Sequence, residues 1–236
     1  MNQIGIITAL IPEAACLTSL PITPGEIMRL ENNICLYVCG MGAERAGTAA
    51  MEMIRAGMDT LVSWGTAGAI APDLNPGDLL VPESIVAFDG RVYRTAKHWR
   101  SNVINKLVDC PSNIYLGQLA DSMHVLTTAE DKTDTASNYK TAMAVDMESA
   151  AIAEVASKHE KPCIVVRVIS DSKGMIIPDI ALKISDQYGR VKFRNLLVQM
   201  FIHPMQIPKL IALARGYGKA ARTMKWIGER LKIMFP

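Results

Sequence analysis

The sequence has few of the residues that build disulfide frameworks or metal centres. Its 236 residues include only five cysteines and four histidines. The cysteines are odd in number, form no C-x-x-C pair and have no histidine cluster nearby, so neither a disulfide scaffold nor a zinc site is indicated. We therefore expect no metal, no cofactor and a reducing, cytoplasmic setting.

The chain also lacks a long apolar run. The longest late run, residues 196–202, contains Gln199 and is far shorter than the roughly 20 residues that a membrane-spanning helix needs. The apolar stretch at residues 4–12 has no Lys or Arg before it and is followed at once by Glu13, which argues against a signal peptide. We expect a chain that does not cross a membrane.

The glycine-rich loops of common nucleotide-binding folds are missing. A dinucleotide fold requires G-x-G-x-x-G directly after its first strand, and TALIPEA at residues 8–14 contains no glycine. GMGAER at residues 40–45 lacks the third glycine, and no Walker loop occurs. Dinucleotide-binding and P-loop folds are therefore excluded.

Half of the residues are hydrophobic, and they are grouped into short, nearly all-apolar runs. Such runs predict strands of a sheet that is covered on both faces. The expected strands are residues 4–9, 34–39, 60–64, 79–81 with 84–88, and 163–169, and helices are expected at 43–56 and 147–159. This alternation indicates an α/β domain over residues 1–182, in which segment 91–139 has no clear pattern.

Suggestive residues follow four of these strands, at residues 10–13, 40–42, 65–68 and 170–171. In sheets of this kind, ligands bind where the strands end, so we expect these segments to share a crevice. The glycines and Thr66 of the third segment would allow close backbone approach and offer amide donors to a phosphate, water or sugar oxygen. A tight turn would need the same residues.

Arg167 lies in the middle of the apolar run CIVVRVIS. A buried guanidinium is costly unless carboxylates or a bound anion satisfy it. Its candidate partners are Glu13, Glu148 and an anionic ligand. A salt bridge that only joins the sheet to a helix is an equally good interpretation.

Two acidic segments carry the remaining candidates. Asp171 follows the last strand beside Ser170, where it could be either a helix cap or an acid catalyst. Asp146, Met147 and Glu148 begin an expected helix, where the helix dipole favours negative charge. Capping explains Asp146 well and Glu148 less well.

These segments, in this order, resemble the purine nucleoside phosphorylase and uridine phosphorylase superfamily, especially its methylthioadenosine/S-adenosylhomocysteine nucleosidases. The matching segments are IGIITALIPEA, SWGTAGAIAPDLNPGDLLVP, AVDMESAAIAEVA and VVRVISD, within residues 4–171. The resemblance implies a three-layer α/β/α fold with a central mixed, largely parallel sheet. It implies an enzyme that cleaves the N-glycosidic bond of an adenine nucleoside, and a homo-oligomer.

The resemblance also assigns roles by position. Glu148 would hold the ribose hydroxyls and Met147 would pack against the sugar. Asp171 would donate a proton to the purine N7, and Ser170 would support the base. The residues that would position a water or phosphate nucleophile are Glu13, Thr66, Gly65 and Arg167, with Glu13 acting as the base toward water. Segment 116–140 departs from the family pattern, and we place the base wall near residues 125–128.

Residues 183–236 form a basic C-terminal extension, with 11 Lys and Arg against 2 Asp and Glu. A helical arrangement from Gln206 onward is amphipathic. Its apolar stripe comprises Leu210, Leu213, Ala214, Tyr217, Ala220, Ala221, Met224, Ile227, Leu231 and Phe235. This helix could pack on the domain or on another subunit, or it could lie on an anionic membrane surface. Nucleic acid is a poorer explanation because the rest of the chain is acidic.

The segment from Ile184 to Arg215 resembles the extension of hopanoid-associated phosphorylases, through its GRV, HP-x-Q-I-P and L-A-R elements. That resemblance implies adenosylhopane, a lipid-linked nucleoside, as the substrate, and a peripheral position on the inner face of the membrane. The alternatives are a nucleosidase for small soluble thioadenosines, a non-catalytic nucleoside-binding relative, and an adaptor recruited to membranes by its tail.

Overall fold

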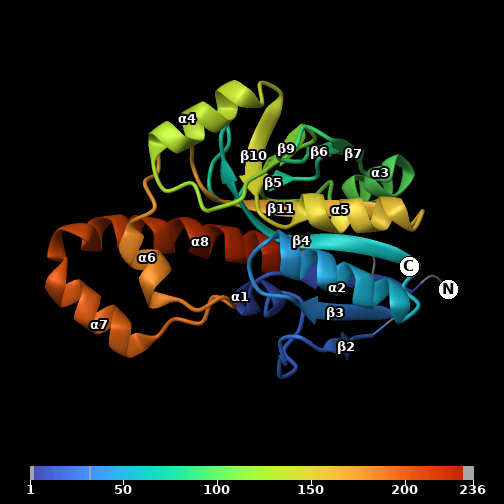
Figure 1. Ribbon diagram of the computed structural model, residues 1–236, viewed down its shortest axis with the longest axis horizontal. Helices are drawn as coiled ribbons and strands as arrows, with labels where there is room; N and C mark the ends of the chain where they lie inside the picture. Colours follow the sequence, from blue (N-terminus) through green and yellow to red (C-terminus); the bar gives the residue numbers. More distant parts are fainter. Residues whose placement is uncertain (1–2, 32, 231–236) are drawn as a thin grey trace.

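The structure is a computed structural model that describes residues 3–31 and 33–230, with a central sheet between two layers of helices (Figure 1). The strands are β1 (Ile4–Thr8), β2 (Ile27–Arg29), β3 (Ile34–Val38), β4 (Thr60–Ala69), β5 (Leu79–Leu80), β6 (Ser84–Val86), β7 (Val92–Arg94), β8 (Ile114–Tyr115), β9 (Gln118–Asp121), β10 (Ala142–Asp146) and β11 (Cys163–Asp171). The helices are α1 (Ile11–Ala14), α2 (Ala43–Arg55), α3 (Lys97–Lys106), α4 (Ala129–Asn138), α5 (Ser149–Lys158), α6 (Asp179–Ile184), α7 (Phe193–Ile202) and α8 (Ile207–Gly228), with a 3-10 turn at Pro204–Gln206.

Strand β4 is the centre of the sheet. It pairs in parallel with β1 on one side and with β11 on the other, and its last residues pair antiparallel with β10. The main strand order is β2-β3-β1-β4-β10-β9-β6-β7, and β11 also pairs with β5. Because β1, β3, β4 and β11 run parallel, their carboxyl ends meet at one edge, where the sequence places its candidate site residues.

Successive residues of the strands point to opposite faces, and each face has its own helical cover. Ile7 joins the core formed with α2 and α5, whereas Ile6 joins the core formed with α1, α3 and α8. The predicted fold class, a three-layer α/β/α arrangement around a mixed and mostly parallel sheet, is therefore confirmed. Segment 91–139, which had no clear pattern, contains β7, β8, β9, α3 and α4.

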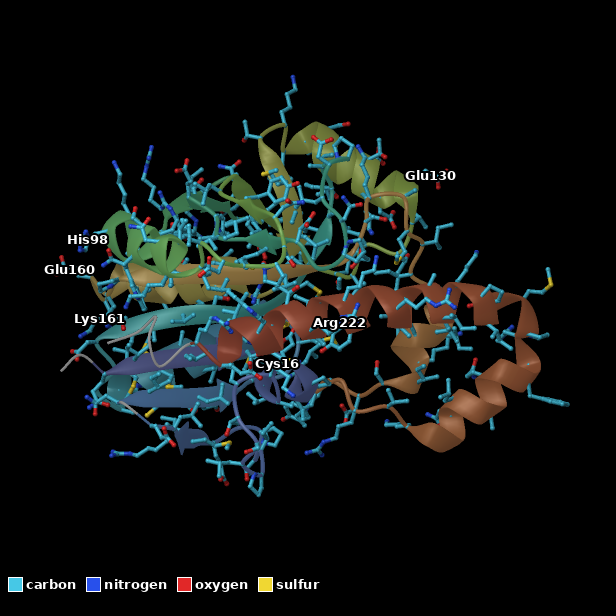
Figure 2. The ribbon with its side chains drawn as sticks, turned by 180° about the vertical axis from the view of Figure 1, so that it is seen from behind. Cys16, His98, Glu130, Glu160, Lys161 and Arg222 are labelled. Atoms are coloured by element: carbon cyan, nitrogen blue, oxygen red, sulfur yellow. The ribbon has the colours of Figure 1, made fainter. Side chains whose placement is uncertain are left out.

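The apolar stripe of the C-terminal helix packs against the sheet from Gly216 onward. Ala220, Met224 and Ile227 are buried in the same core as β1 and β11, and the Cys16 thiol faces the Ala221 carbonyl at 3.7 Å (Figure 2). Packing on the domain, one of the three predicted alternatives, therefore describes this part of the helix. The predicted stripe residues Leu231 and Phe235 lie outside the described residues.

The predicted boundary between the catalytic domain and the extension, at residue 182, falls inside α6. Their division into separate units remains a prediction. Within residues 3–31 and 33–230, no helix combines the length and the apolar character that crossing a bilayer requires.

Helix α8 approaches β11 closely at one glycine, and this contact predicts a stability difference. A Cβ at Gly216 would lie 2.4 Å from the Ser170 carbonyl oxygen, whereas a Cβ at Gly218 would meet nothing within 4 Å. Both positions gain the same helix propensity from alanine, but only Gly216→Ala forces the helix away from the strand. We expect Gly216→Ala to unfold about 1–3 kcal/mol more easily than Gly218→Ala. Thermal unfolding followed by circular dichroism measures this, and equal melting temperatures would contradict it.

Candidate active site

A pocket opens at the carboxyl ends of β1, β4, β10 and β11. Six of the eight residues predicted from the sequence line it, and they are Glu13, Thr66, Met147, Glu148, Ser170 and Asp171. The other two, Gly65 and Arg167, do not line the pocket, but Arg167 lies close to Gly65, behind the lining residues. The parallel topology thus brings together residues that are up to 158 positions apart in the sequence.

Glu13 is held in place by four hydrogen bonds. It stands on the single turn α1, directly after β1, and its side chain is 3% exposed. Its Oε1 accepts from the backbone N–H and the hydroxyl of Thr66, at 2.8 and 2.9 Å. Its Oε2 accepts from the Thr8 hydroxyl at 2.7 Å and from the Leu10 N–H at 3.2 Å. The carboxylate is therefore fixed by donors from β1, β4 and its own helix start.

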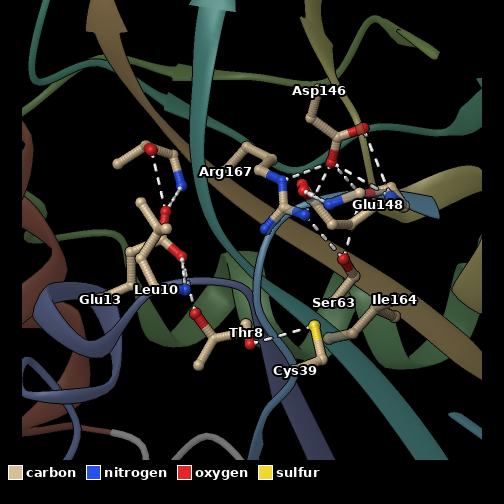
Figure 3. Close-up of polar contacts among 12 residues, drawn as sticks. Thr8, Leu10, Glu13, Cys39, Ser63, Asp146, Glu148, Ile164 and Arg167 are labelled. Atoms are coloured by element: carbon tan, nitrogen blue, oxygen red, sulfur yellow. Dashed lines mark hydrogen bonds and ion pairs between the residues drawn. The ribbon is translucent and has the colours of Figure 1, made fainter. Parts of the chain in front are cut away.

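Arg167 forms a buried ion pair with Asp146. Its Nη2 lies 2.6 Å from the Asp146 carboxylate and also donates to the Ser63 hydroxyl at 2.9 Å. Figure 3 shows Glu13 on one side of this guanidinium and Glu148 on the other. Burial alone would lower the pKa of Arg167, but Asp146, Glu148 and Glu13 together raise it above its ordinary value.

This ion pair corrects two expectations. The candidate partners of Arg167 were Glu13, Glu148 and an anionic ligand, whereas the bonded carboxylate is that of Asp146. Asp146 was expected to open a helix, but it ends β10 and serves both as the partner of Arg167 and as an acceptor for the Ser149 N–H. The third nitrogen of the guanidinium, Nη1, is buried and makes no hydrogen bond to any described residue.

The glycines of WGTAG lie inside β4 and not in a loop after it, contrary to the sequence prediction. These positions have no room for a larger residue, because polar side chains from other elements pass directly over them. A Cβ at Gly65 would lie 2.6 Å from Arg167 Nη1 and 3.0 Å from both oxygens of Glu13. A Cβ at Gly68 would lie 3.1 Å from Asp171 Oδ2. Glycine here permits close side-chain approach and does not form a turn.

Glu148 is a buried carboxyl at the N-terminus of α5. Its Oε1 accepts the Gly42 N–H at 2.9 Å, and Met147 beside it also lines the pocket. Burial, reinforced by the charge of Asp146, raises the pKa of Glu148 to about 7, although Arg167 acts in the opposite direction. Glu148 therefore changes its charge near neutral pH.

Asp171 is the last residue of β11 and is 3% exposed. Its Oδ1 accepts from the Ser170 hydroxyl at 2.6 Å, and its Oδ2 forms an ion pair with Lys132 of α4. Lys132 was not among the predicted site residues. The T-x-x-D pattern at Thr128–Asp131 marks the start of α4 and could have placed Lys132 on its first turn, but nothing in the sequence indicates its burial.

The remaining wall of the pocket comes from the segment that departs from the family pattern. Of the predicted stretch 125–128, Val125 and Leu126 line the pocket, whereas Thr128 caps α4. Further lining residues on this side are Ser122, His124 and Ile177. Together with Lys132, which also lines the pocket, this wall therefore combines apolar and polar side chains.

Comparison with known proteins relates the chain to one group of enzymes. Curated 5'-methylthioadenosine/S-adenosylhomocysteine nucleosidases of Haemophilus ducreyi and Tolumonas auensis are 27% and 26% identical to it. These alignments cover 72% and 75% of this chain and 84% and 89% of the relatives.

Solved structures share the fold. The nucleosidase of the same name from Neisseria meningitidis, in complex with methylthio-immucillin-A, has a TM-score of 0.73 at 16% identity, over 99% of this chain and 100% of that one. The futalosine hydrolase of Helicobacter pylori has a TM-score of 0.68 at 21% identity, over 97% and 98% of the two chains.

The model of one protein family, described as the phosphorylase superfamily, matches residues 19–179. This match covers most of the chain and includes β2 to β11. The prediction of an enzyme related to nucleoside phosphorylases and nucleosidases is confirmed, and the chain belongs to the phosphorylase superfamily.

Proposed function

We propose that this protein hydrolyses the N-glycosidic bond of an adenine nucleoside. The observation that carries the proposal is the position of the Glu13 carboxylate, fixed by Thr8, Leu10 and Thr66 at the edge of the pocket. A carboxylate in that position can take a proton from an attacking water. The curated relatives, which are named as nucleosidases, support the same reaction class.

The same geometry favours water over phosphate as the nucleophile. Both donors of Thr66, which the family resemblance assigns to the nucleophile, are already bonded to Glu13. A phosphate dianion in this place would meet the Glu13 carboxylate, and like charges at such short range repel strongly.

Glu148 and Met147 form the ribose subsite in this proposal. An ionised Glu148 accepts hydrogen bonds from two sugar hydroxyls, and the Met147 side chain packs on the sugar. Positive charge develops on the ribose as the base departs, so the carboxylates of Glu148 and Glu13 stabilise the transition state. This requires that Glu148 be deprotonated.

Asp171 faces the leaving base. The bond between C1' and N9 breaks more easily when the purine takes up a proton at N7, and Asp171 delivers that proton. Ser170, which bonds to the carboxylate of Asp171, keeps it in the plane of the base. Because Glu13, Glu148 and Asp171 are all present and line one pocket, we favour an enzyme over the non-catalytic nucleoside-binding alternative.

We further propose that the substrate carries a lipid at its 5' end, with adenosylhopane as the candidate and soluble thioadenosines as the alternative. The supporting observation is a series of exposed apolar residues along the sequence from Ile176, next to the pocket-lining Ile177, to the turn between α7 and α8. Its members are Ile176, Leu182, Val191, Val198, Phe201, Ile202 and Met205. Exposed apolar side chains of this number suit a lipid substituent better than a small thioether.

The turn between α7 and α8 is the natural membrane contact. Figure 1 shows it at the end of the molecule that is farthest from the sheet. Phe201 and Met205 are each 89% exposed there, and residues 187–228 contain eight Lys and Arg but no Asp or Glu. A symmetric contact between two copies would set like charges together, whereas an anionic bilayer complements them. Membrane attachment thus involves the turn between α7 and α8 and not the apolar stripe from Gly216 onward.

A homo-oligomer and a cytoplasmic location remain predictions.

The role of Glu13 predicts a large loss of hydrolysis in Glu13→Gln. We expect wild-type protein to release adenine and a free sugar from methylthioadenosine or adenosylhopane, at a rate that phosphate does not change. Removing the base should lower kcat about 10²–10⁴-fold. Mass spectrometry of the sugar product measures this, with the exposed Glu44→Gln as the control. Formation of a ribosyl phosphate, or near-normal turnover in Glu13→Gln, would contradict water activation.

The raised pKa of Glu148 predicts a specific dependence on pH. Since the charged form binds the ribose, kcat/KM should fall as the pH drops below about 7. The fall should approach about tenfold per pH unit, because kcat/KM reports ionisations of the free enzyme. In Glu148→Gln, kcat/KM should be low and flat over the same range. An unchanged acid limb in that variant would assign the ionisation to another group.

The turn between α7 and α8 predicts binding to anionic vesicles. We expect the full chain to sediment with phosphatidylglycerol vesicles and not with phosphatidylcholine vesicles. The double variant Phe201→Ser/Met205→Ser should lose at least about tenfold in affinity, because burial of these side chains contributes most of the apolar energy. Val108→Ser, at a residue that is 81% exposed near the end of α3, is the matched control. Equal binding of the double variant and wild type would refute membrane contact at this turn.

A further inference from the structure

Lys132 is a buried cation in an unfavourable position. It is 1% exposed and ranks among the largest fully buried side chains of the described residues. It also stands on the first turn of α4, where the helix dipole disfavours positive charge. Lysine is almost never fully buried unless its charge is paired, so this placement requires strong compensation.

The compensation comes entirely from the end of β11 and the loop after it. The Lys132 ammonium forms an ion pair with Asp171 Oδ2, and donates to the carbonyl oxygens of Ser172 at 2.8 Å and of Met175 at 3.2 Å. An ammonium group has three N–H donors, and each has an acceptor here. Lys132 itself lines the pocket, but with all three donors engaged it acts on a ligand through Asp171.

A backbone hydrogen bond connects the loop that Lys132 holds to the wall of the pocket. The Ile177 N–H donates to the Thr127 carbonyl at 2.9 Å, and Ile177 itself lines the pocket. The loop from Ser172 to Ile177 is thus attached to the start of α4 at two places. Lys132 fixes the orientation of the Asp171 carboxylate as well as the loop that follows it.

The ion pair between Lys132 and Asp171 also places a proton source next to the leaving group. Both oxygens of Asp171 accept hydrogen bonds, one from Lys132 and one from the Ser170 hydroxyl. Of these two donors the ammonium is by far the stronger acid. A purine that leaves with the electron pair of its glycosidic bond is a much stronger base than a carboxylate, so it can draw a proton through Asp171.

We propose that Lys132 is a positioning residue that supplies, through Asp171, the proton taken up by the departing purine. This inference rests on the proposed hydrolysis. The C1'–N9 bond breaks and its electron pair goes to the purine. Lys132 Nζ passes a proton to the Asp171 carboxylate and becomes a neutral amine, and the carboxyl group so formed gives its proton to N7, which leaves Asp171 a carboxylate again. Water bonds to C1' and gives its proton to Glu13; solvent then restores the proton of Lys132 and removes that of Glu13.

The test compares two leaving groups in Lys132→Met. An adenine nucleoside needs protonation of its leaving group, whereas p-nitrophenyl riboside releases a stable phenolate that does not. We expect Lys132→Met to lose about 10²–10⁴-fold in kcat on the nucleoside and less than about fivefold on the nitrophenyl riboside. Retained cleavage of the second substrate also shows that the variant is folded. A purely structural role would lower both rates equally.

Lys132→Arg separates proton supply from simple charge pairing. A guanidinium can keep the ion pair with Asp171 but does not give up a proton in proteins. We expect this variant to cleave the nitrophenyl riboside normally and the nucleoside slowly. The exposed Lys140→Met, just beyond the same helix, should resemble wild type. Full nucleoside turnover in Lys132→Arg or Lys132→Met would overturn the inference, whereas failure of the wild type on every nucleoside would instead overturn the proposed hydrolysis.

Discussion

The ion pair between Arg167 and Asp146 is the interaction on which the rest of the site depends. Glu13 and Glu148 lie close enough to the guanidinium to raise its pKa, so one buried positive charge attracts three carboxyl groups. In a core of low dielectric constant, those carboxyl groups would repel one another without it. Because Arg167 belongs to β11, Asp146 to β10 and Glu13 to the turn after β1, the attraction of this guanidinium also helps to hold these strand ends together.

Much of this arrangement could be predicted from the sequence. The apolar runs placed β1 and β3 to within one residue and β11 to within two, because a doubly covered sheet leaves little room for polar residues. Glu13 and Asp171 were found because each follows such a run, and parallel strands bring their carboxyl ends to one edge. Topology therefore predicts where the site residues lie, whereas the roles assigned to them come from the family resemblance.

What could not be predicted depends on contacts between distant segments. Asp146 looked like a helix cap, and it does accept the Ser149 N–H. Because capping alone accounts for an aspartate at this position, there was no reason in the sequence to expect its ion pair with Arg167. Gly65 and Gly68 looked like a loop because the polar side chains that pass over them come from distant parts of the sequence. Lys132 lies in a polar stretch, AEDKTD, that is typical of an exposed helix. Its burial depends on contacts with the end of β11 and the loop after it, which lie far away in the sequence.

The contact between Gly216 and the Ser170 carbonyl bears on how the C-terminal extension relates to the catalytic core. A terminal helix that merely covers a surface can be exchanged between relatives as a unit. This one instead meets the strand that carries Ser170 and Asp171 at a distance that only glycine allows. The extension is consequently not a portable module: a chimera that joined it to another member of the superfamily would have to keep both the glycine and the path of the receiving strand.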